Sequence, residues 1–429
     1  MKVILFTLLA FLTGWNSLFA QSSRMWINRY EGHYYDTPVE LDLDRKGNCI
    51  VFGSSYPVGS FNNSDYLVVK YSALGEEAWT FRYDLTDDDR PQAMEVHNDN
   101  SIYLTGTAGT LRLDADGNLL WSKTDHDGYD LSVDAEGNCY VVGGLGSDAM
   151  VRKYDSNGVL LWSKTYDGPS GQGDFATHVI ALLQGNIYVG GYQNSIHDGE
   201  TADLMLLKYD QYGDLKWNSS YNGPKNKNDL LRAMTVDTAG NIYIAGWTNV
   251  PYYYYGGDIG VIKFDSSGGK IWDKIFNGSS NLDDSPTGIA SYGGSGVAVC
   301  GTTEGFTSLN DFIVLRYDAN GNLLWSFIWD GGGSAFDTAT SLQFMGGNLY
   351  AAGGGSFSSG VPPDFVIHVF GKVGKHLGFY RHDGPAKNLD VISDIELNKG
   401  VYVTGESYGF DTQSDFMTVK FSYLFSDEK

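Results

Sequence analysis

A strand-like phrase, an apolar run that closes on glycine, recurs along the chain and constrains its fold more than any other feature. The eight copies are "NCIVFG" (48–53), "SIYLTG" (101–106), "NCYVVG" (138–143), "NIYVGG" (186–191), "NIYIAG" (241–246), "VAVCG" (297–301), "NLYAAG" (348–353) and "VYVTG" (401–405). Self-similarity of this kind indicates that each copy belongs to one supersecondary unit, which buries its apolar face against its neighbours. The chain is therefore expected to form one array of similar units.

Two further landmarks accompany the copies. The first is a run with an aromatic residue or leucine near its end, at Tyr71, Leu113, Tyr154, Tyr209, Phe264, Tyr317, Phe370 and Phe421. The second is a run with an early aromatic residue, at Trp79, Trp121, Trp162, Trp217, Trp272, Trp325 and, as a substitute, Phe379. The last unit lacks this second run, whereas "RMWINRY" (24–30) carries Trp26 ahead of the first unit. The N-terminal segment is thus expected to supply the strand that the last unit lacks.

Each unit holds four candidate strands, for instance "QAMEVH", "SIYLTG", "TLRLD" and "NLLWSK" between Gln92 and Lys123. Their apolar residues alternate with period two or form short runs, which indicates strands rather than helices. Four strands in a repeat of roughly 40 to 55 residues are typical of a β-propeller blade. We therefore expect an all-β chain, a β-propeller of four-stranded blades whose ring is closed by the N-terminal strand around Trp26. Counting predicts eight blades, or seven if one of the two short units is degenerate.

One stretch resembles a known family. "DGPSGQGDFATHVIALLQGNIYVGGYQNSIHDGETADLMLLKYDQYGDLKW" (167–217) is similar to the bacterial seven-bladed β-propeller repeat, with its Gly-Asn-x-Tyr-Val-x-Gly strand and its Asp-x-x-Gly-x-Leu turn. The resemblance covers nearly all of the chain after Ala20 and implies an exported or surface propeller. It implies no single activity and no catalytic motif. The apparent eighth unit departs from the blade number that is usual in this family.

The composition suits this fold and excludes one class of partner. Glycine provides 55 of 429 residues and aromatic residues 14 %, which suits short strands joined by tight turns. The chain has 29 Lys and Arg against 52 Asp and Glu, a net charge of −23. Nucleic-acid binding draws much of its free energy from basic side chains that release counterions. A nucleic-acid partner is therefore not expected.

The first residues have the pattern of a signal peptide. One lysine precedes an apolar run from Val3 to Leu12, and a looser stretch ends in Ala20. The run is about half of the roughly 20 residues that span a bilayer. We expect residues 1–20 to be cleaved, leaving 21–429 as a single propeller domain with no membrane span. The mature chain is expected in the periplasm, at the cell surface or secreted, as a monomer.

The turns with an Asp-x-x-Gly core suggest a metal loop, a cofactor cradle or a bend. They are "DRKGN" (44–48), "DADGN" (114–118), "DAEGN" (134–138), "DSNGV" (155–159), "DQYGD" (210–214), "DTAGN" (237–241), "DSSGG" (265–269) and "DANGN" (318–322). A helix-flanked calcium loop needs Gly sixth and Glu twelfth, whereas Gly is fourth here. Quinone-dependent propellers carry a similar phrase, but it docks blades. We therefore predict hairpin turns in which Asp bonds the following amides and Gly is left-handed.

Two groups of residues are candidates for binding. One carboxylate precedes the first strand of each unit, at Asp36, Asp89, Asp130, Asp174, Asp229, Asp284, Asp337 and Asp390. First strands that line the channel would place these at its mouth, where a negative ring concentrates cations; the alternative is that each Asp caps its own turn. The loops between second and third strands carry aromatic residues, including Trp247, Tyr252, Tyr253, Tyr254 and Tyr255. Such rings suit sugars or protein hot spots, or they pack beneath their loops.

Catalytic, metal and cofactor signals are sparse. "GESYG" (405–409) matches a nucleophile elbow but lacks the strand, turn and helix that the elbow needs. Cys49, Cys139 and Cys300 lie in separate strand-like runs without metal-ligand spacing, so we expect buried thiols, no metal site and no cofactor. We predict an exported, non-enzymatic binding or scaffold protein that recognises a protein or carbohydrate through a loop-rich face. The alternative is an exported hydrolase or lyase that acts on glycans with carboxylates from several blades, because sequence spacing does not reveal such pairs.

Overall fold

The chain is built almost entirely of strands. The computed structural model describes residues 24–30, 32, 35–57, 63–85, 88–169, 171–195, 202–251, 256–305, 309–332, 336–358, 361–386, 388–409 and 414–423. These residues form strands β1 to β32 and one short 3-10 helix, η1 (Gly293–Ser295). The predicted all-β class is confirmed. The predicted signal peptide, residues 1–20, lies outside the described residues.

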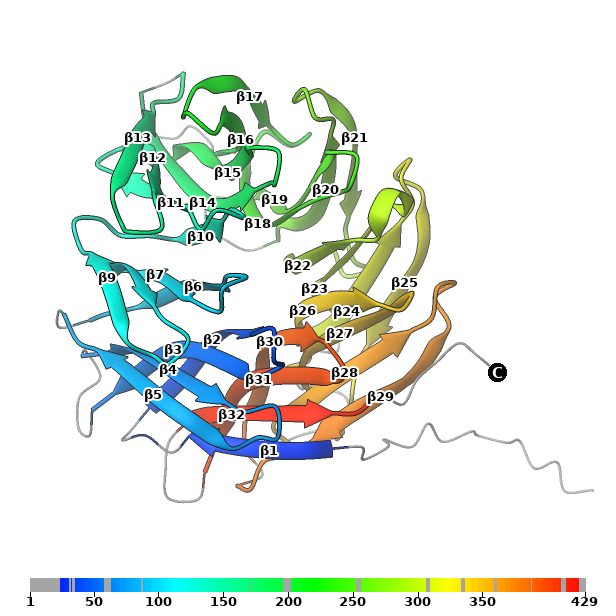
Figure 1. Ribbon diagram of the computed structural model, residues 1–429. Coiled ribbons are helices and arrows are strands. Elements are labelled where there is room, and N and C mark those ends of the chain that lie inside the picture. Colours follow the sequence, from blue (N-terminus) through cyan, green and yellow to red (C-terminus); the bar gives the residue numbers. More distant parts are fainter. Residues whose placement is uncertain are drawn as a thin grey trace, which may run out of the picture.

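Consecutive strands pair into antiparallel sheets of four, which we call blades (Figure 1). Blade 1 contains β2 (Tyr35–Leu43), β3 (Cys49–Tyr56), β4 (Asp65–Tyr71) and β5 (Glu77–Tyr83), and blade 2 contains β6 (Pro91–Val96), β7 (Ile102–Gly106), β8 (Gly109–Leu113) and β9 (Leu119–Lys123). Blade 3 contains β10 (Asp130–Val133), β11 (Cys139–Leu145), β12 (Asp148–Tyr154) and β13 (Leu160–Tyr166), and blade 4 contains β14 (Gly173–Ala181), β15 (Asn186–Ser195), β16 (Asp203–Asp210) and β17 (Leu215–Tyr221). Blade 5 contains β18 (Asn228–Val236), β19 (Ile242–Val250), β20 (Asp258–Phe264) and β21 (Lys270–Phe276). Blade 6 contains β22 (Asp284–Ser291), β23 (Val297–Glu304), β24 (Asn310–Tyr317) and β25 (Leu323–Trp329). Blade 7 contains β26 (Thr338–Met345), β27 (Asn348–Gly355), β28 (Asp364–Phe370) and β29 (His376–His382).

Blade 8 is completed from the other end of the chain. It contains β30 (Asp390–Leu397), β31 (Val401–Tyr408), β32 (Ser414–Phe421) and β1 (Arg24–Tyr30). Strand β1 pairs antiparallel with β32, with Trp26 opposite Lys420. A single parallel pair, Tyr35 with Ser414, joins blades 8 and 1 into one sheet of eight strands. The N-terminal strand therefore pairs with the last strand of the chain, as the sequence predicted.

The first strand of each blade lies innermost, around a common centre (Figure 1). Each of these inner strands contacts the inner strand of the next blade, from β2 through β6 and onward to β30, which contacts β2. Hydrogen bonds cross the junctions, as from Thr340 Oγ1 to Ile392 O at 2.7 Å and from Ser393 Oγ to Pro38 O at 2.9 Å. The N-terminal and C-terminal blades are therefore neighbours.

The glycine that closes each second strand has a physical reason. The first strand bulges opposite it, as between Ala339 and Ser341 in blade 7. The bulge brings a carbonyl so close that a Cβ on Gly353 would lie 1.9 Å from Thr338 O. Approaches of 1.9 to 2.5 Å to a carbonyl in the first strand or just before it recur at Gly53, Gly106, Gly143, Gly191, Gly301 and Gly405. Because a side chain has no room there, the strand phrase ends on glycine in blade after blade.

The tryptophan of the fourth strand docks each blade onto the next one. Trp217 of blade 4 lies against Gly268 of blade 5, and its indole N–H donates to Ser266 O at 3.2 Å. The same bond joins Trp26 to Ala73, Trp79 to Ala115, Trp121 to Ser156, Trp162 to Gln211 and Trp272 to Ala319. Trp26 thus docks blade 8 onto blade 1 with the contact that the internal junctions use.

Blade 7 lacks this contact. The sequence predicted Phe379 as its substitute for tryptophan, and this prediction is wrong. The tryptophan position of blade 7 is occupied by Gly378, because Gly378 pairs with Val369 as Trp79 pairs with Lys70 in blade 1. Strand β32 of the next blade pairs with β1 from the N-terminus, and not with a strand that an Asp-x-x-Gly hairpin joins to it. Phe379 instead stacks on Phe357, with 5.7 Å between ring centroids.

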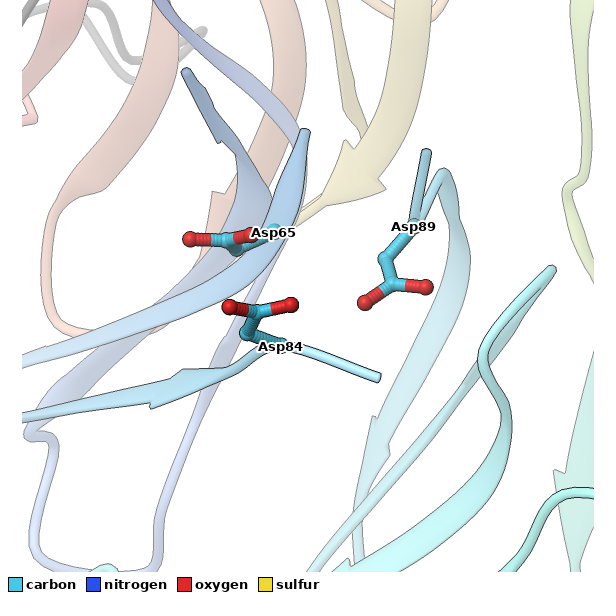
Figure 2. Close-up of side chains that lie close together, drawn as sticks. All are labelled: Asp65, Asp84 and Asp89. Atoms are coloured by element: carbon cyan, nitrogen blue, oxygen red, sulfur yellow. The ribbon is translucent and has the colours of Figure 1, made fainter. Parts of the chain in front are cut away.

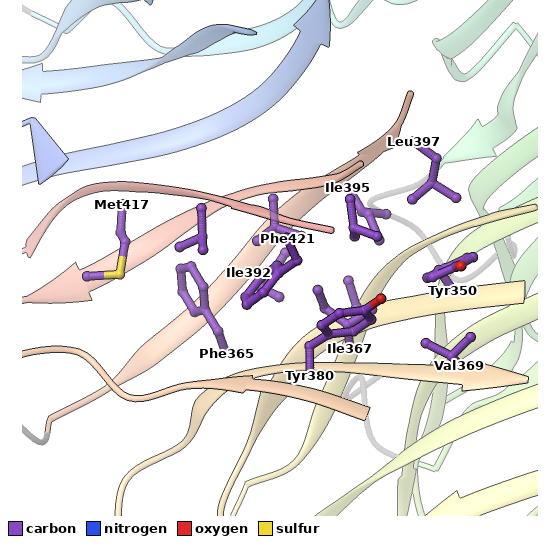
Figure 3. Packing of buried hydrophobic residues seen from close by; sticks show 14 residues of the cluster. Tyr350, Phe365, Ile367, Val369, Tyr380, Ile392, Ile395, Leu397, Met417 and Phe421 are labelled. Carbon is purple, nitrogen blue, oxygen red and sulfur yellow. The ribbon is translucent and has the colours of Figure 1, made fainter. Parts of the chain in front are cut away.

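Apolar clusters fill the space between neighbouring sheets. Figure 3 shows one in which Ile367 and Tyr380 of blade 7 pack with Ile392 and Met417 of blade 8. Each of these four side chains is at most 1 % exposed. Full burial of one such side chain stabilises a fold by about 1.5–3 kcal/mol, so these clusters hold the blades together.

The three cysteines are buried and free, as predicted. Cys300 belongs to the cluster that packs blade 6 against blade 7, and burial raises the pKa of its thiol to about 12. A thiol that is buried and protonated is inert. These residues therefore contribute apolar volume rather than reactivity.

Candidate functional site

Two sets of loops share one face of the ring. The backbone N–H of Asp229, before blade 5, donates to Ala202 O, just before the third strand of blade 4, at 2.7 Å. Asp284 makes the same bond to Gly257 O at 2.8 Å. The connections between blades thus lie beside the loops between second and third strands. We call this side the loop-rich face; the Asp-x-x-Gly turns lie on the opposite face.

Seven of the predicted carboxylates lie at blade junctions on this face, and we call them the junction aspartates: Asp36, Asp89, Asp174, Asp229, Asp284, Asp337 and Asp390. All are at most 1 % exposed. Each carboxylate accepts a local backbone N–H at 2.5 to 2.8 Å, as Asp337 accepts that of Gly331. They cap their own turns, which was the alternative prediction, and their carboxylates do not form an exposed ring.

Burial changes the acidity of these caps. Desolvation raises the pKa of Asp229, Asp284, Asp337 and Asp390 to about 6, although the amide donors oppose the shift. It also raises the pKa of Asp36. Carboxyl groups of this kind exchange protons near pH 6, which makes them candidates for chemistry as well as structure.

Asp130 does not belong with the junction aspartates, which corrects the sequence prediction. It pairs with Val142, the residue before Gly143, and therefore has the register of Glu40, which pairs with the residue before Gly53. Its carboxylate accepts the N–H of Val179 in β14 at 2.7 Å. Asp130 thus links the inner strands of blades 3 and 4. Its position along the chain suggested a junction aspartate because β10 is only four residues long and begins at Asp130 itself.

At three junctions, a junction aspartate meets two further carboxylates. Figure 2 shows Asp65, Asp84 and Asp89 between blades 1 and 2, where one oxygen of each lies within 4.8 Å of the others. The other clusters are Asp311, Asp330 and Asp337 between blades 6 and 7, and Asp364, Asp383 and Asp390 between blades 7 and 8. In each cluster the first and third residues are buried and the middle one is exposed. Such clusters reach solvent and offer the oxygen ligands that Ca²⁺ prefers.

The three clusters differ in their counter-charge. Arg82 pairs with Asp65 at 2.8 Å, and Arg381 pairs with Asp364 at 2.5 Å. Ile328 occupies the same register in blade 6, since it pairs with Ile313 as Arg82 pairs with Leu67. Blade 6 therefore has an apolar residue, Ile328, at the register where blades 1 and 7 have Arg82 and Arg381.

The sequence contained a signal for these clusters that spacing within one unit did not reveal. An Asp stands in the first two residues of several third strands, as in "DYLVVKY" and "DFVIHVF", and another follows the fourth strand. The two come from the ends of different strands, about 20 residues apart, and the third comes from the next blade. Only the packing of one blade on the next brings them together.

The Asp-x-x-Gly turns are hairpins, as predicted. Asp155 Oδ1 accepts the N–H groups of Asn157 and Val159, both at 2.8 Å. Gly158 has φ of 77°, in the left-handed region that favours glycine. The carboxylate is occupied by its own turn, and the carbonyl of Ser156 receives the indole of Trp121. The turn thus bends the chain and docks the blade.

The aromatic candidates divide in two. Trp247 is only 8 % exposed, so the expectation of an exposed ring is wrong. Its indole N–H donates to Asp283 Oδ1 at 3.1 Å, and the guanidinium of Arg232 lies 5.2 Å from its ring. Trp247 therefore packs beneath its loop, which removes it from the exposed surface. Tyr252, Tyr253, Tyr254 and Tyr255 lie outside the described residues.

Comparisons with known proteins agree on the fold. A family model described as a β-propeller repeat matches residues 228–253, which span β18 and β19. No curated protein matches the chain. Among solved structures, the β-propeller domain of the Trilobed protease from Pyrococcus furiosus is 7 % identical, with 93 % of this chain and 98 % of that one covered and a TM-score of 0.47. A protein from Lactobacillus plantarum is 13 % identical, with 76 % and 93 % covered and a TM-score of 0.46.

A protein of unknown function from Bacteroides caccae is also similar, with 12 % identity, 82 % of this chain and 94 % of that one covered, and a TM-score of 0.38. Among the described residues, no helix has the length and apolar character needed to cross a membrane. Blade architecture and matched repeat lead to one conclusion: the chain is a β-propeller protein that carries, at residues 228–253, the β-propeller repeat its sequence resembles.

Proposed function

We propose that the protein is an exported, non-enzymatic β-propeller that binds a protein or glycan through its loop-rich face, with Ca²⁺ held by the carboxylate clusters of that face. The observation that carries this proposal is the convergence of two buried carboxylates and one exposed carboxylate at each of three blade junctions on that face. The signal-peptide pattern at residues 1–20 supports export, and the net charge of −23 favours cations at the surface.

Ca²⁺ takes six to eight oxygen ligands, more than three carboxylates supply. The remaining positions go to water, to backbone carbonyls or to oxygens of a ligand. Sugar hydroxyls and protein carboxylates are both suitable oxygens. An ion bound at the rim of a junction therefore offers a ligand a contact that the chain alone does not provide, and binding would depend on calcium.

Millimolar calcium is expected to raise the unfolding temperature of the mature chain by a few degrees, because an ion that binds only the folded state stabilises it. Asp330→Asn should remove part of this shift, and a triple variant with Asp84→Asn and Asp383→Asn should remove it all. Asp214→Asn, an exposed position on the opposite face, is the matched control. Differential scanning calorimetry with and without calcium measures the shift. An unchanged wild-type unfolding temperature would contradict the cation sites.

Ligand binding is tested on glycan and protein arrays with the mature chain, in calcium and in chelator. We expect a set of calcium-dependent ligands, weakened at least tenfold by the triple variant. A second variant with Tyr252 to Tyr255 as alanines tests the aromatic loop separately. Full binding by that variant would mean that the aromatic loop does not contribute to ligand binding. Binding that persists in chelator would mean that the loop-rich face binds its ligand without the cation clusters.

One observation favours the second candidate function, an exported enzyme that acts on glycans. Asp337, whose pKa burial raises to about 6, lies within 4.8 Å of the exposed Asp330, and glycoside hydrolases use a pair of carboxyl groups of which one has a raised pKa. Release of reducing sugar from a polysaccharide panel, lost in both Asp330→Asn and Asp337→Asn, would establish this function instead. Calcium-dependent binding without turnover would exclude it for those substrates.

A further inference from the structure

Six carboxylates on inner strands take no part in the loop-rich face, and we call them the acidic seam: Glu40, Asp42, Glu95, Asp130, Asp394 and Glu396. Five of them accept a backbone N–H from the inner strand of the next blade. These bonds run from Leu41 to Asp394 (3.1 Å), Met94 to Glu40 (2.6 Å), Val96 to Asp42 (2.8 Å), Val133 to Glu95 (2.9 Å) and Val179 to Asp130 (2.7 Å). An inner strand has an open edge whose N–H groups need acceptors, and the seam supplies them.

The seam occupies half of the ring. It lies on β30, β2, β6 and β10, the inner strands of blades 8, 1, 2 and 3. In blades 4 to 7 the same two registers hold no acid: His178, Ile180, Ala233, Thr235, Gly288, Ala290, Ser341 and Gln343. The acidic half also contains the junction at which β30 meets β2 without a covalent connection. Repulsion among these carboxylates therefore acts on the place where the ring closes.

The groups that surround the seam provide little positive charge. The strongest charges on Glu40, Asp394 and Glu396 are those of other seam members. Strand β26 contributes only neutral partners, since Ser341 bonds Asp394 at 3.0 Å and Gln343 bonds Glu396 at 3.1 Å.

Two basic groups, Lys420 and Arg112, and two histidines, His97 and His178, complete these surroundings. His97 lies near Glu95 and lowers its pKa slightly against the larger effect of burial. Lys420 and Arg112 act on the buried thiols of Cys49 and Cys139 behind the inner strands. His178 of β14 is neutral above its pKa of about 4. The seam is thus a set of buried acids whose charges are poorly compensated.

We propose that the acidic seam is a proton-controlled clamp: proton uptake holds the inner strands of blades 8, 1, 2 and 3 together, and proton loss loosens this half of the ring. A protonated carboxyl keeps a carbonyl oxygen that accepts the neighbouring N–H, so the clamp bonds survive protonation. Ionisation of all six groups adds repulsion across the junctions of blades 8 and 1, 1 and 2, and 2 and 3, where acids lie on both sides. The clamp concerns the inner strands and is independent of the loop-rich face.

The direction of the pH effect follows from the pKa shifts. Burial raises the pKa of Asp394 to about 6, of Glu95 and Asp130 to about 7 and of Glu396 to about 8. These values exceed those of an unfolded chain, so the folded state binds more protons between pH ~4 and ~8. The stability that this proton uptake adds is fully present below the pKa values of the unfolded chain, and it is lost as the pH rises from 6 to 8.

The test compares urea unfolding of the mature wild-type chain at pH 6.5 and pH 8.5, because junction aspartates with pKa values of about 6 have already lost most of their protons at pH 6.5. We expect the unfolding constant to be at least tenfold larger at pH 8.5. In the double variant Glu40→Gln with Glu396→Gln, the logarithm of the ratio between the unfolding constants at pH 8.5 and pH 6.5 should be less than half of its wild-type value. Asp284→Asn, a junction aspartate, and His97→Gln, beside the seam, should keep the wild-type ratio. An equal unfolding constant at both pH values, or an unchanged ratio in the double variant, overturns the proposal.

Hydrogen exchange of the wild-type chain keeps the proposal testable if the double variant does not fold. After correction for intrinsic rates, the amides of Leu41, Met94 and Val133 should lose at least tenfold more protection between pH 6.5 and 8.5 than amides of the inner strands β18 and β22. Equal loss in both halves of the ring would show a global effect and would overturn the clamp.

Discussion

Trp26→Ala is expected to lower the free energy of unfolding by about 3 kcal/mol, the order found when a large aromatic side chain is removed from a packed site. The Trp26 ring covers Gly75, and its indole N–H donates to Ala73 O at 3.3 Å. Its ring centroid lies 6.2 Å from that of Tyr71 in blade 1 and 6.1 Å from that of Tyr402 in blade 8. The residue therefore contacts both sides of the junction that joins the two ends of the chain.

Met25→Ala is the matched control, because Met25 lies in the same strand and is 57 % exposed. Its substitution should change the free energy of unfolding by no more than about 0.5 kcal/mol. Trp162→Ala removes the same docking contact from an internal junction and should have an effect similar to that of Trp26→Ala. Chemical denaturation of the mature chain measures all three. If Trp26→Ala behaves like Met25→Ala, the N-terminal strand does not close the ring.

Gly353→Ala is expected to cost about 3 kcal/mol, at the upper end of the cost of overpacking. The added Cβ would lie 1.9 Å from Thr338 O and 2.9 Å from Ala339 Cα, both backbone atoms of the bulged first strand. Backbone in the middle of a paired sheet has little freedom to move away. The substitution therefore forces either the bulge or the second strand out of register.

Gly246 provides the control for this prediction, since it ends the same strand phrase in blade 5. A Cβ there would meet Leu204 Cδ1 at 3.2 Å and Leu230 O at 3.4 Å, contacts that a small shift relieves. Gly246→Ala should cost about 1 kcal/mol or less. Thermal and urea unfolding of the two variants measure the difference. Equal effects would mean that the bulge does not explain the glycine.

The acidic seam and the docking of Trp26 act on the same junction. Ser393 and Leu41 bond across it on the inner side, and Trp26 and Lys420 bond to Ala73 O on the turn side. Stability of the ring is therefore expected to depend on pH through its inner strands and on apolar packing through its outer strand. The two contributions are far enough apart to add in a combined variant.

Much of the fold was predictable because its signals are local. Alternating apolar residues, the Asp-x-x-Gly turns and the glycine of the second strand each depend on neighbours within one hairpin. The displaced Trp26 was predictable because six other units carry a tryptophan at that place. Phe379 was assigned wrongly because it is the aromatic residue next to the tryptophan position, although that position itself holds Gly378.

The candidate sites were less predictable. The junction aspartates were found as residues, but their capping role depends on backbone N–H groups that point inward. Asp130 was grouped with them because counting residues does not detect a short first strand. Asp65, Asp84 and Asp89 come from two blades, so no spacing within one unit relates them.

The sequence by itself determined the repeating unit, the position of its turns and the need for an N-terminal strand in the last blade, because these follow from contacts between residues close along the chain. Tertiary structure alone decided which carboxylates meet. Leu41 bonds Asp394 across 353 residues, and Asp89 meets Asp65 only where one blade packs on the next. Whether an aspartate caps a turn, joins a cation cluster or clamps two inner strands depends on the neighbouring blade, since that blade supplies the donors and the opposing charges.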